Sequence, residues 1–149
     1  MKILRVAAAL TIFIGSAPAY AQVTFKHISG EEAARAVRGN TLNSEFAGGK
    51  TFSMSIHKRT ESGHVERHMD WDEVFMIQDG NELLNFGKTA SNPRQESPGE
   101  FSGSTITDGK SVMLHAGDIV TMPAGMWHQH VLKTPTLRYV LIRTEKPRS

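Results

Sequence analysis

The chain has 149 residues, no cysteine and a formal net charge of +2 at pH 7. The lack of cysteine excludes disulfides and thiolate metal ligands. Two of the 17 Lys and Arg residues lie in a predicted N-terminal leader, and the other 15 balance the 15 Asp and Glu residues. The chain without this leader is therefore formally neutral. Its charge gives no reason to expect nucleic acid as a partner.

The N-terminal residues 1–21 have the pattern of a secretory signal peptide. Lys2 and Arg5 precede an apolar run over 6–15, and Ala19-Tyr20-Ala21 supplies the small residues of a cleavage site. The apolar run is too short to span a membrane comfortably. We therefore expect a periplasmic or secreted protein with no membrane attachment after cleavage.

Residues 22–149 are predicted to form one domain that begins with a short helix over 30–38. Ser29 and Glu32 have the spacing of a capping box, and Gly39 ends the helix. Many short segments with Gly, Pro and Asn punctuation follow, which indicates an all-β fold. The predicted strands are 52–58, 64–68, 73–78, 83–86, 112–115, 119–122, 128–133 and 137–143.

Between residues 88 and 110 the composition changes to Ser, Gly, Pro, Asn and charged residues. A connection this long in a compact domain is usually functional or disordered. We interpret it as a lid over a pocket, as an arm across a homodimer, or as a flexible loop without function.

Ligand-type side chains recur at alternate positions of the predicted strands, so each row shares one face of a sheet. Imidazole and carboxylate together suit Fe(II), Mn(II), Ni(II), Cu(II) or Zn(II), and two His with one carboxylate form the facial set of non-haem Fe(II) oxygenases. The rows are His64-Glu66-His68, Glu73-Phe75-Ile77 and His128-His130.

Two spaced motifs, Glu66-x-His68-x4-Glu73-x6-Gly80 and Gly117-x5-Pro123-x-Gly125-x2-His128, together resemble the two signature motifs of the cupin superfamily. The resemblance covers roughly residues 50–143, and it implies a double-sheet jelly-roll barrel. Gly80 is expected at positive φ, and the turn at 123–125 is expected to deliver His128 onto its strand.

The chain departs from the family pattern at three positions. Glu66 stands where the family usually has the first histidine of a His-x-His pair, and Thr60 takes the place of a leading glycine, with Gly63 the nearest one. In the second motif Leu132 occupies a position that is often Asn.

The resemblance implies that one divalent transition metal (Fe, Mn, Ni, Cu or Zn) is bound by Glu66, His68, Glu73 and His128. For Glu66 two roles stay open, because its carboxylate either coordinates the metal or orients another ligand. His64 would take the place of Glu66 as a ligand if the register of this strand were shifted by two residues. His130 is expected either to orient a metal ligand or to line the pocket. His27, His57 and His115 are interpreted as ordinary solvated or hydrogen-bonded side chains.

Functions of three classes fit this pattern, and an enzyme acting on a small organic molecule is favoured. A dioxygenase-like oxidoreductase is the first expectation, and a lyase or isomerase in which His64 or His130 moves a proton fits the same ligands. The other classes are a non-catalytic protein that binds a small molecule or metal, and a structural cupin that has lost its metal. Six apolar side chains could line a pocket, but most of them are expected to belong to the ordinary barrel core. They are Met54, Phe75, Ile77, Met122, Met126 and Trp127.

The signal-peptide pattern predicts cleavage between Ala21 and Gln22. Intact-mass measurement of natively exported protein should give a chain that begins at Gln22. A soluble exported protein that retains residues 1–21 would contradict the prediction.

Overall fold

The computed structural model describes residues 27, 29–31, 44–48 and 52–146, and for 44–48 only the backbone. The predicted signal peptide lies outside these residues. Gly30 and Glu31 are helical, and the remainder of the predicted helix lies outside the described residues. No helix in the described part of the chain is long and apolar enough to cross a membrane.

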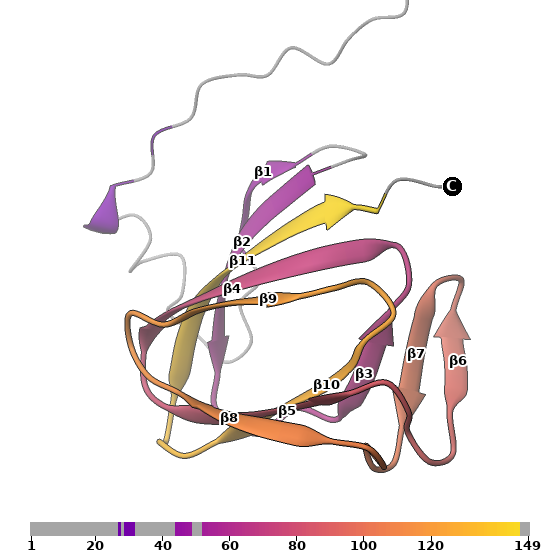
Figure 1. Ribbon diagram of the computed structural model, residues 1–149. Helices are drawn as coiled ribbons and strands as arrows, with labels where there is room; N and C mark the ends of the chain where they lie inside the picture. Colours follow the sequence, from indigo (N-terminus) through magenta and orange to yellow (C-terminus); the bar gives the residue numbers. More distant parts are fainter. Residues whose placement is uncertain (1–26, 28, 32–43, 49–51, 147–149) are drawn as a thin grey trace, which may run out of the picture.

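Two antiparallel sheets face each other and enclose the interior, as the predicted jelly-roll barrel requires (Figure 1). The five-stranded sheet has the order β1 (Ser44–Gly48), β2 (Phe52–Arg59), β11 (Leu137–Glu145), β4 (Trp71–Asp79), β9 (Ile119–Met122). The six-stranded sheet has the order β6 (Arg94–Ser97), β7 (Glu100–Gly103), β3 (Val65–His68), β10 (Trp127–Leu132), β5 (Glu82–Gly87), β8 (Lys110–Leu114).

All eight predicted strands are present, and β9 begins and ends at the predicted residues. The sequence reading missed β1, β6 and β7. Two of these, β6 and β7, lie inside the connection over 88–110, which therefore contains a β-hairpin where we predicted no strand. The reason is composition: all four residues of β6 are exposed, so this edge strand lacks the alternation by which a half-buried strand is recognised.

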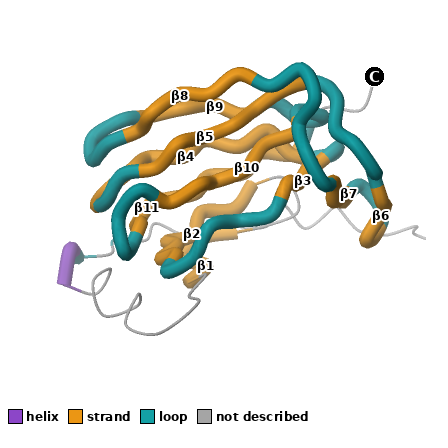
Figure 2. Tube along the Cα trace, turned by 90° about the horizontal axis from the view of Figure 1, so that it is seen from below, coloured by secondary structure: helices purple, strands orange, loops and turns teal. Residues whose placement is uncertain are grey.

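The β6–β7 hairpin extends the six-stranded sheet beside β3 (Figure 2). Asp108 closes its base by accepting hydrogen bonds from the backbone N–H groups of Lys88 and Thr89. The guanidinium of Arg67, on β3, lies 4.5 Å from the ring centroid of Phe101 and 4.6 Å from that of Trp127. These cation–π contacts fasten β7 onto the barrel.

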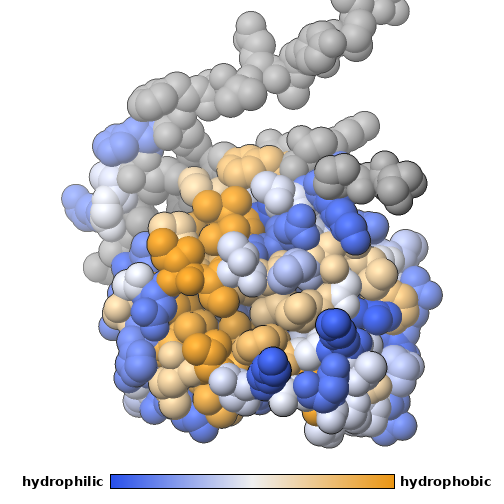
Figure 3. Space-filling view, viewed as in Figure 1, coloured by the Kyte–Doolittle hydropathy of each residue, from blue (hydrophilic) through white to orange (hydrophobic). Residues whose placement is uncertain are grey.

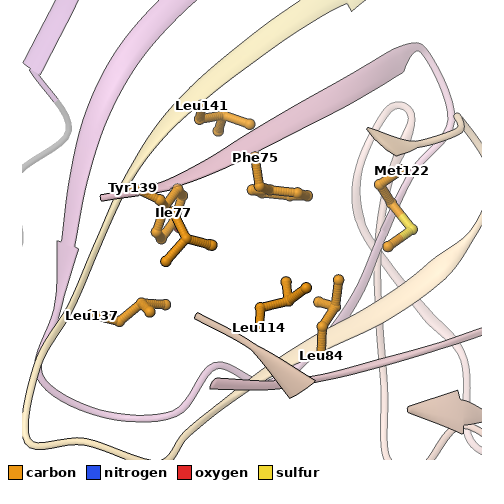
Figure 4. Packing of buried hydrophobic residues seen from close by; sticks show 8 residues of the cluster. All are labelled: Phe75, Ile77, Leu84, Leu114, Met122, Leu137, Tyr139 and Leu141. Carbon is orange, nitrogen blue, oxygen red and sulfur yellow. The ribbon is translucent and has the colours of Figure 1, made fainter. Parts of the chain in front are cut away.

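The hydrophobic core fills the space between the sheets (Figure 4). The predicted row on β4 is confirmed, because Glu73, Phe75 and Ile77 are all buried. It runs from a carboxylate to hydrophobic side chains, so one end of the interior is polar and the other is apolar. The buried cluster consists of Phe75, Ile77, Leu84, Leu114, Met122, Leu137, Tyr139 and Leu141.

Hydrophobic side chains also gather on part of the outer surface (Figure 3). Val112 and Met113 on β8 and Ile119 on β9 are exposed. Both strands are at the edge of their sheets.

Gly80 and Gly117 have positive φ angles of 82° and 97°, which confirms the expectation for Gly80. A Cβ added to Gly80 would lie 2.2 Å from the carbonyl oxygen of Thr136, whereas a Cβ on Gly117 would meet no atom within 4 Å. Both positions favour glycine for its backbone freedom, but only Gly80 is also sterically enclosed.

This difference predicts unequal costs for the two alanine variants. Gly117→Ala should lose about 1–2 kcal/mol of unfolding free energy, the cost of a left-handed conformation. Gly80→Ala should lose about 1–3 kcal/mol more, because its Cβ also overpacks against backbone. Urea denaturation of both metal-free variants measures this, and equal losses would show that the contact with Thr136 is relieved without cost.

Candidate metal centre

Glu66 and His68 on β3 and His128 on β10 form a group whose ligand atoms all lie within 4.8 Å of one another. The two strands are antiparallel neighbours, and His128 is the direct cross-strand partner of Glu66. The Nε2 atom of His128 lies 3.6 Å from Oε1 of Glu66. His68 and His128 are 8% and 1% exposed, so both imidazoles are shielded from water. The pairing of β3 with β10 thus joins the two sequence motifs.

Glu73 approaches the same point from β4 in the facing sheet. Its Oε2 lies 3.5 Å from Nε2 of His128, and its Oε1 lies 3.7 Å from Nε2 of His68. Oε1 also accepts a hydrogen bond of 2.8 Å from Nε of Arg143. Oε2 is buried and has no hydrogen-bond partner among the described residues. A buried carboxylate oxygen in that state is costly, and a cation between the imidazoles would satisfy it.

Groups behind the two histidines fix how the rings point. Nδ1 of His68 is hydrogen-bonded to the carboxylate of Glu100 on β7. Nδ1 of His128 lies 3.4 Å from the carbonyl oxygen of Met126. Each contact leaves Nε2 facing the carboxylates, and such partners commonly orient metal-binding histidines. The donor set therefore fits a divalent transition metal.

The charged side chains of the group shift one another's pKa values. Burial raises the pKa of Glu66, but its contacts with His128, His68 and Arg59 outweigh burial and lower that pKa to about 2. Burial lowers the pKa of His128, while Glu66 and Glu73 raise it to a net value above the ordinary range. The carboxylates thus favour the protonated form of His128, and metal binding, which needs the neutral imidazole, competes with that proton.

A cavity of about 240 Å³ adjoins the group. Its walls come from both sheets and combine charged, aromatic and aliphatic side chains. The lining residues are His57, Lys58, Arg59, Glu66, Glu73, Phe75, His128, His130, Tyr139, Leu141 and Arg143.

His130 lines the cavity, as predicted, and is paired with a carboxylate that the sequence reading missed. Its Nδ1 lies 2.6 Å from Oε2 of Glu82, and both side chains are buried. Its Nε2 is buried without a hydrogen-bond partner among the described residues. Burial lowers the pKa of His130 more than Glu82 raises it, so the imidazole is neutral at pH 7.

Tyr139 packs between the sheets and contacts two imidazoles. The ring of His57 stacks on it at a centroid distance of 5.0 Å, and the ring of His130 at 5.5 Å. Burial, with a smaller contribution from Arg59, lowers the pKa of His57 to about 4. His57, interpreted from the sequence as an ordinary side chain, is therefore a neutral part of the cavity wall.

The other histidines do not line the cavity. The His64 side chain is 74% exposed, and its Nε2 is 3.8 Å from Oε2 of Glu66. His64 is not among the residues that line the cavity. His27 and His115 are exposed, as interpreted from the sequence.

Sequence reasoning missed five charged or polar side chains at the centre: Arg59, Glu82, Glu100, Tyr139 and Arg143. Each lies 32 or more residues from its hydrogen-bond partner along the chain. Alternation along β11 does place Tyr139 and Arg143 on one face, which is the one signal that could have identified them.

The comparisons with known proteins agree with this fold. A family model described as a JmjC domain matches residues 39–148. Comparison with curated protein sequences gave no match.

Solved structures show the same fold at low sequence identity. A protein with a double-stranded β-helix domain from Klebsiella pneumoniae is 14% identical, with a TM-score of 0.56 over 81% of this chain and 90% of that one. A cupin superfamily protein from Desulfitobacterium hafniense is 15% identical, with a TM-score of 0.56 over 76% and 87%. A cupin-2 domain protein from Shewanella frigidimarina is 18% identical, with a TM-score of 0.53 over 81% and 94%.

The geometry predicts that bound metal stabilises the fold. A ligand at a thousand times its dissociation constant adds about 4 kcal/mol to the unfolding free energy. Chelator should therefore lower the Tm of the wild type and leave a His68→Ala, His128→Ala double variant nearly unchanged.

The matched control is His115→Ala, which removes an exposed imidazole that does not line the cavity and should respond to chelator as the wild type does. Thermal unfolding with and without chelator, together with metal analysis of each protein, provides the measurement. Equal chelator sensitivity in the wild type and the double variant would rule out His68 and His128 as ligands.

Proposed function

Because the chain belongs to the JmjC domain family, within the cupin superfamily, we propose that it is an exported, metal-dependent enzyme that acts on a small organic molecule. A dioxygenase-like oxidoreductase is the first candidate. The observation that carries the proposal is the group of Glu66, His68 and His128 at the wall of a cavity of about 240 Å³. Two imidazoles and one carboxylate are the ligand set of non-haem Fe(II) oxygenases.

Glu66, His68 and His128 would hold the metal, and Glu73 would be either a fourth ligand or the nearest anionic neighbour. When bound, a divalent metal supplies a Lewis acid for a chelating substrate and an open position for oxygen. Glu100 keeps Nε2 of His68 directed inward, and Arg143 holds Glu73 in place. Phe75 and Leu141 exclude water from the inner wall of the cavity.

A lyase or isomerase is the second candidate, and the pair of Glu82 and His130 favours it. Glu82 fixes Nδ1 of His130, so the free Nε2 in the cavity wall is placed to accept a proton from a bound substrate. His130 suits this role better than His64, because the side chain of His64 is exposed.

Oxygen consumption distinguishes the two candidates. Protein reconstituted with Fe(II) should consume oxygen and form an oxygenated product with at least one member of a panel of small chelating acids, enols and catechols. The His68→Ala, His128→Ala variant should show only background uptake, and product analysis by mass spectrometry identifies the reaction.

Turnover without oxygen in protein loaded with Mn(II) or Zn(II) would instead identify a lyase or isomerase. His130→Gln should then lose turnover while its metal content stays at the wild-type level. Metal and ligand binding without turnover under either condition would contradict the enzyme assignment and leave a binding protein.

A further inference from the structure

We propose that a groove on the outer face of the six-stranded sheet binds a phosphate group, either free or in a small organic ester. The groove has a volume of about 310 Å³ and is lined by residues of β5, β8 and β10 and of the loop between β7 and β8. It shares no lining residue with the cavity beside the metal centre. The inference therefore goes beyond the proposed function and does not depend on it.

Three polar side chains in one cross-strand row form the floor of the groove. Gln129 on β10 is the partner of Asn85 on β5, which is in turn the partner of Ser111 on β8 (Figure 2). Side chains alternate between the two faces of a sheet, and His128 and His130, on either side of Gln129, line the inner cavity. Gln129 and the rest of its row therefore face outward.

A chain of hydrogen bonds fixes the direction of the two amides in this row. The carbonyl oxygen of Gly63 can only accept, and Nε2 of Gln129 donates to it at 3.0 Å. Oε1 of Gln129 accepts from Nδ2 of Asn85 at 3.4 Å, and Oδ1 of Asn85 accepts from the hydroxyl of Ser111 at 2.6 Å. Each amide oxygen thus already accepts a hydrogen bond, while each NH2 group keeps one N–H without a partner among the described residues.

The loop between β7 and β8 forms a wall of the groove and adds two hydroxyl donors. The backbone of Ser91 holds this loop, because its N–H donates to the carbonyl of Thr105 at 2.8 Å and its carbonyl accepts from the N–H of Ser104 at 2.9 Å. Oγ of Ser104 accepts from Nδ2 of Asn92 at 3.2 Å, which leaves the Ser104 O–H available as a donor. The Thr105 hydroxyl has no hydrogen-bond partner in the described part of the chain.

Lys110, at the start of β8, is the one charged residue in the lining of the groove. Its ammonium forms no ion pair or hydrogen bond with the residues that the structure describes. Asp108, two positions earlier, does not line the groove, and its carboxylate accepts hydrogen bonds from the backbone N–H groups of Lys88 and Thr89. The groove therefore combines one unpaired positive charge with unused N–H and O–H donors.

Donors around a cation suit an anion that offers several acceptor oxygens. Hydrogen bonds to an ionised acceptor are about twice as strong as neutral ones, and a phosphate group presents three acceptor oxygens. A metal ion is a poor match because no carboxylate lines the groove, and a neutral sugar lacks an aromatic ring on which to stack. The volume corresponds to the share of about ten water molecules, at roughly 30 Å³ each, which leaves room for a small organic group beside the phosphate.

The test titrates the exported chain, labelled with ¹⁵N and loaded with Zn(II), and follows its amide signals by NMR. The probes are glycerol 3-phosphate, inorganic phosphate and, as the neutral match, glycerol. The buffer has low ionic strength, because salt screens the charge of an exposed lysine.

Glycerol 3-phosphate should shift the backbone signals of residues 104–111 and the side-chain NH2 signals of Asn85 and Gln129, with a Kd of about 1 mM or lower. Glycerol should leave these signals in place. Tighter binding of the ester than of inorganic phosphate would identify an organic phosphate as the ligand, and equal binding would identify the phosphate group alone.

Two variants test the donors of the groove. Lys110→Met removes the charge while nearly keeping the length of the side chain, and it should weaken binding about tenfold or more. Thr105→Val has nearly the same shape as the wild type but lacks the hydroxyl, and it should weaken binding about fivefold. The matched control is Lys133→Met, which removes an exposed lysine outside the groove and should bind as the wild type does.

The His68→Ala, His128→Ala double variant controls for phosphate that coordinates the metal. It lacks two candidate ligands but keeps every residue of the groove, so its groove signals should respond as those of the wild type do. Thermal unfolding of every variant shows that the fold is retained.

The phosphate proposal would be overturned if neither phosphate shifted the groove signals, or if glycerol shifted them equally. Equal losses in Lys110→Met and Lys133→Met would show a general attraction to positive charge, and a loss in the histidine double variant alone would place the phosphate on the metal. Both results also contradict the proposal. All these outcomes leave the metal-dependent function to its own tests of metal content and turnover. If Lys110→Met fails to fold, the position of the wild-type shifts and the Thr105→Val variant still decide.

Discussion

Antiparallel register is the constraint on which the centre depends, because it places three of the carboxylates directly opposite the groups that stabilise them. Glu66 is the cross-strand partner of His128, Glu73 of Arg143, and Glu100 of His68. Ionised side chains are costly to bury unless paired, so these positions would be unfavourable in any other alignment. A slip of one residue in β3 would turn both Glu66 and His68 to the outer face. The same hydrogen-bond ladders that hold the sheets together therefore also bring the candidate ligands together.

The sequence predicted the barrel, and it singled out most of the side chains that meet at the candidate metal centre, for identifiable physical reasons. Alternation and turn glycines are local patterns, which is why the row from Glu73 to Ile77 and the turn at Gly80 could be predicted from short segments. The motif spacing supplied His68, Glu73 and His128, and it left Glu66 between two roles. The structure places Glu66 in the group with His68 and His128.

The groups that surround the ligands could not be predicted in this way. A lone acid or arginine on a strand usually faces water, and nothing within a few residues of Glu100 or Arg143 reveals its partner. Glu100 lies 32 residues from His68, and Arg143 lies 70 residues from Glu73. Only strand pairing brings them together. The β6–β7 hairpin was difficult to predict for two other reasons. All residues of β6 are exposed, so the strand has no alternation of apolar and polar residues. Arg67 secures the hairpin through contacts with aromatic rings, and such contacts leave no periodic pattern in the sequence.

Tyr139 gives the cavity its own optical reporter. The chain contains two tyrosines, and the other, Tyr20, falls in the predicted leader. The phenol of Tyr139 stacks with His57 and His130, accepts a hydrogen bond from Arg59 and is buried. A molecule that enters the cavity or engages Arg59 changes the polarity and hydrogen bonding of this tyrosine, whose signal adds to that of Trp71 and Trp127. Occupancy of the interior is thereby coupled to near-ultraviolet absorption, and it can be followed in unlabelled protein by difference spectroscopy.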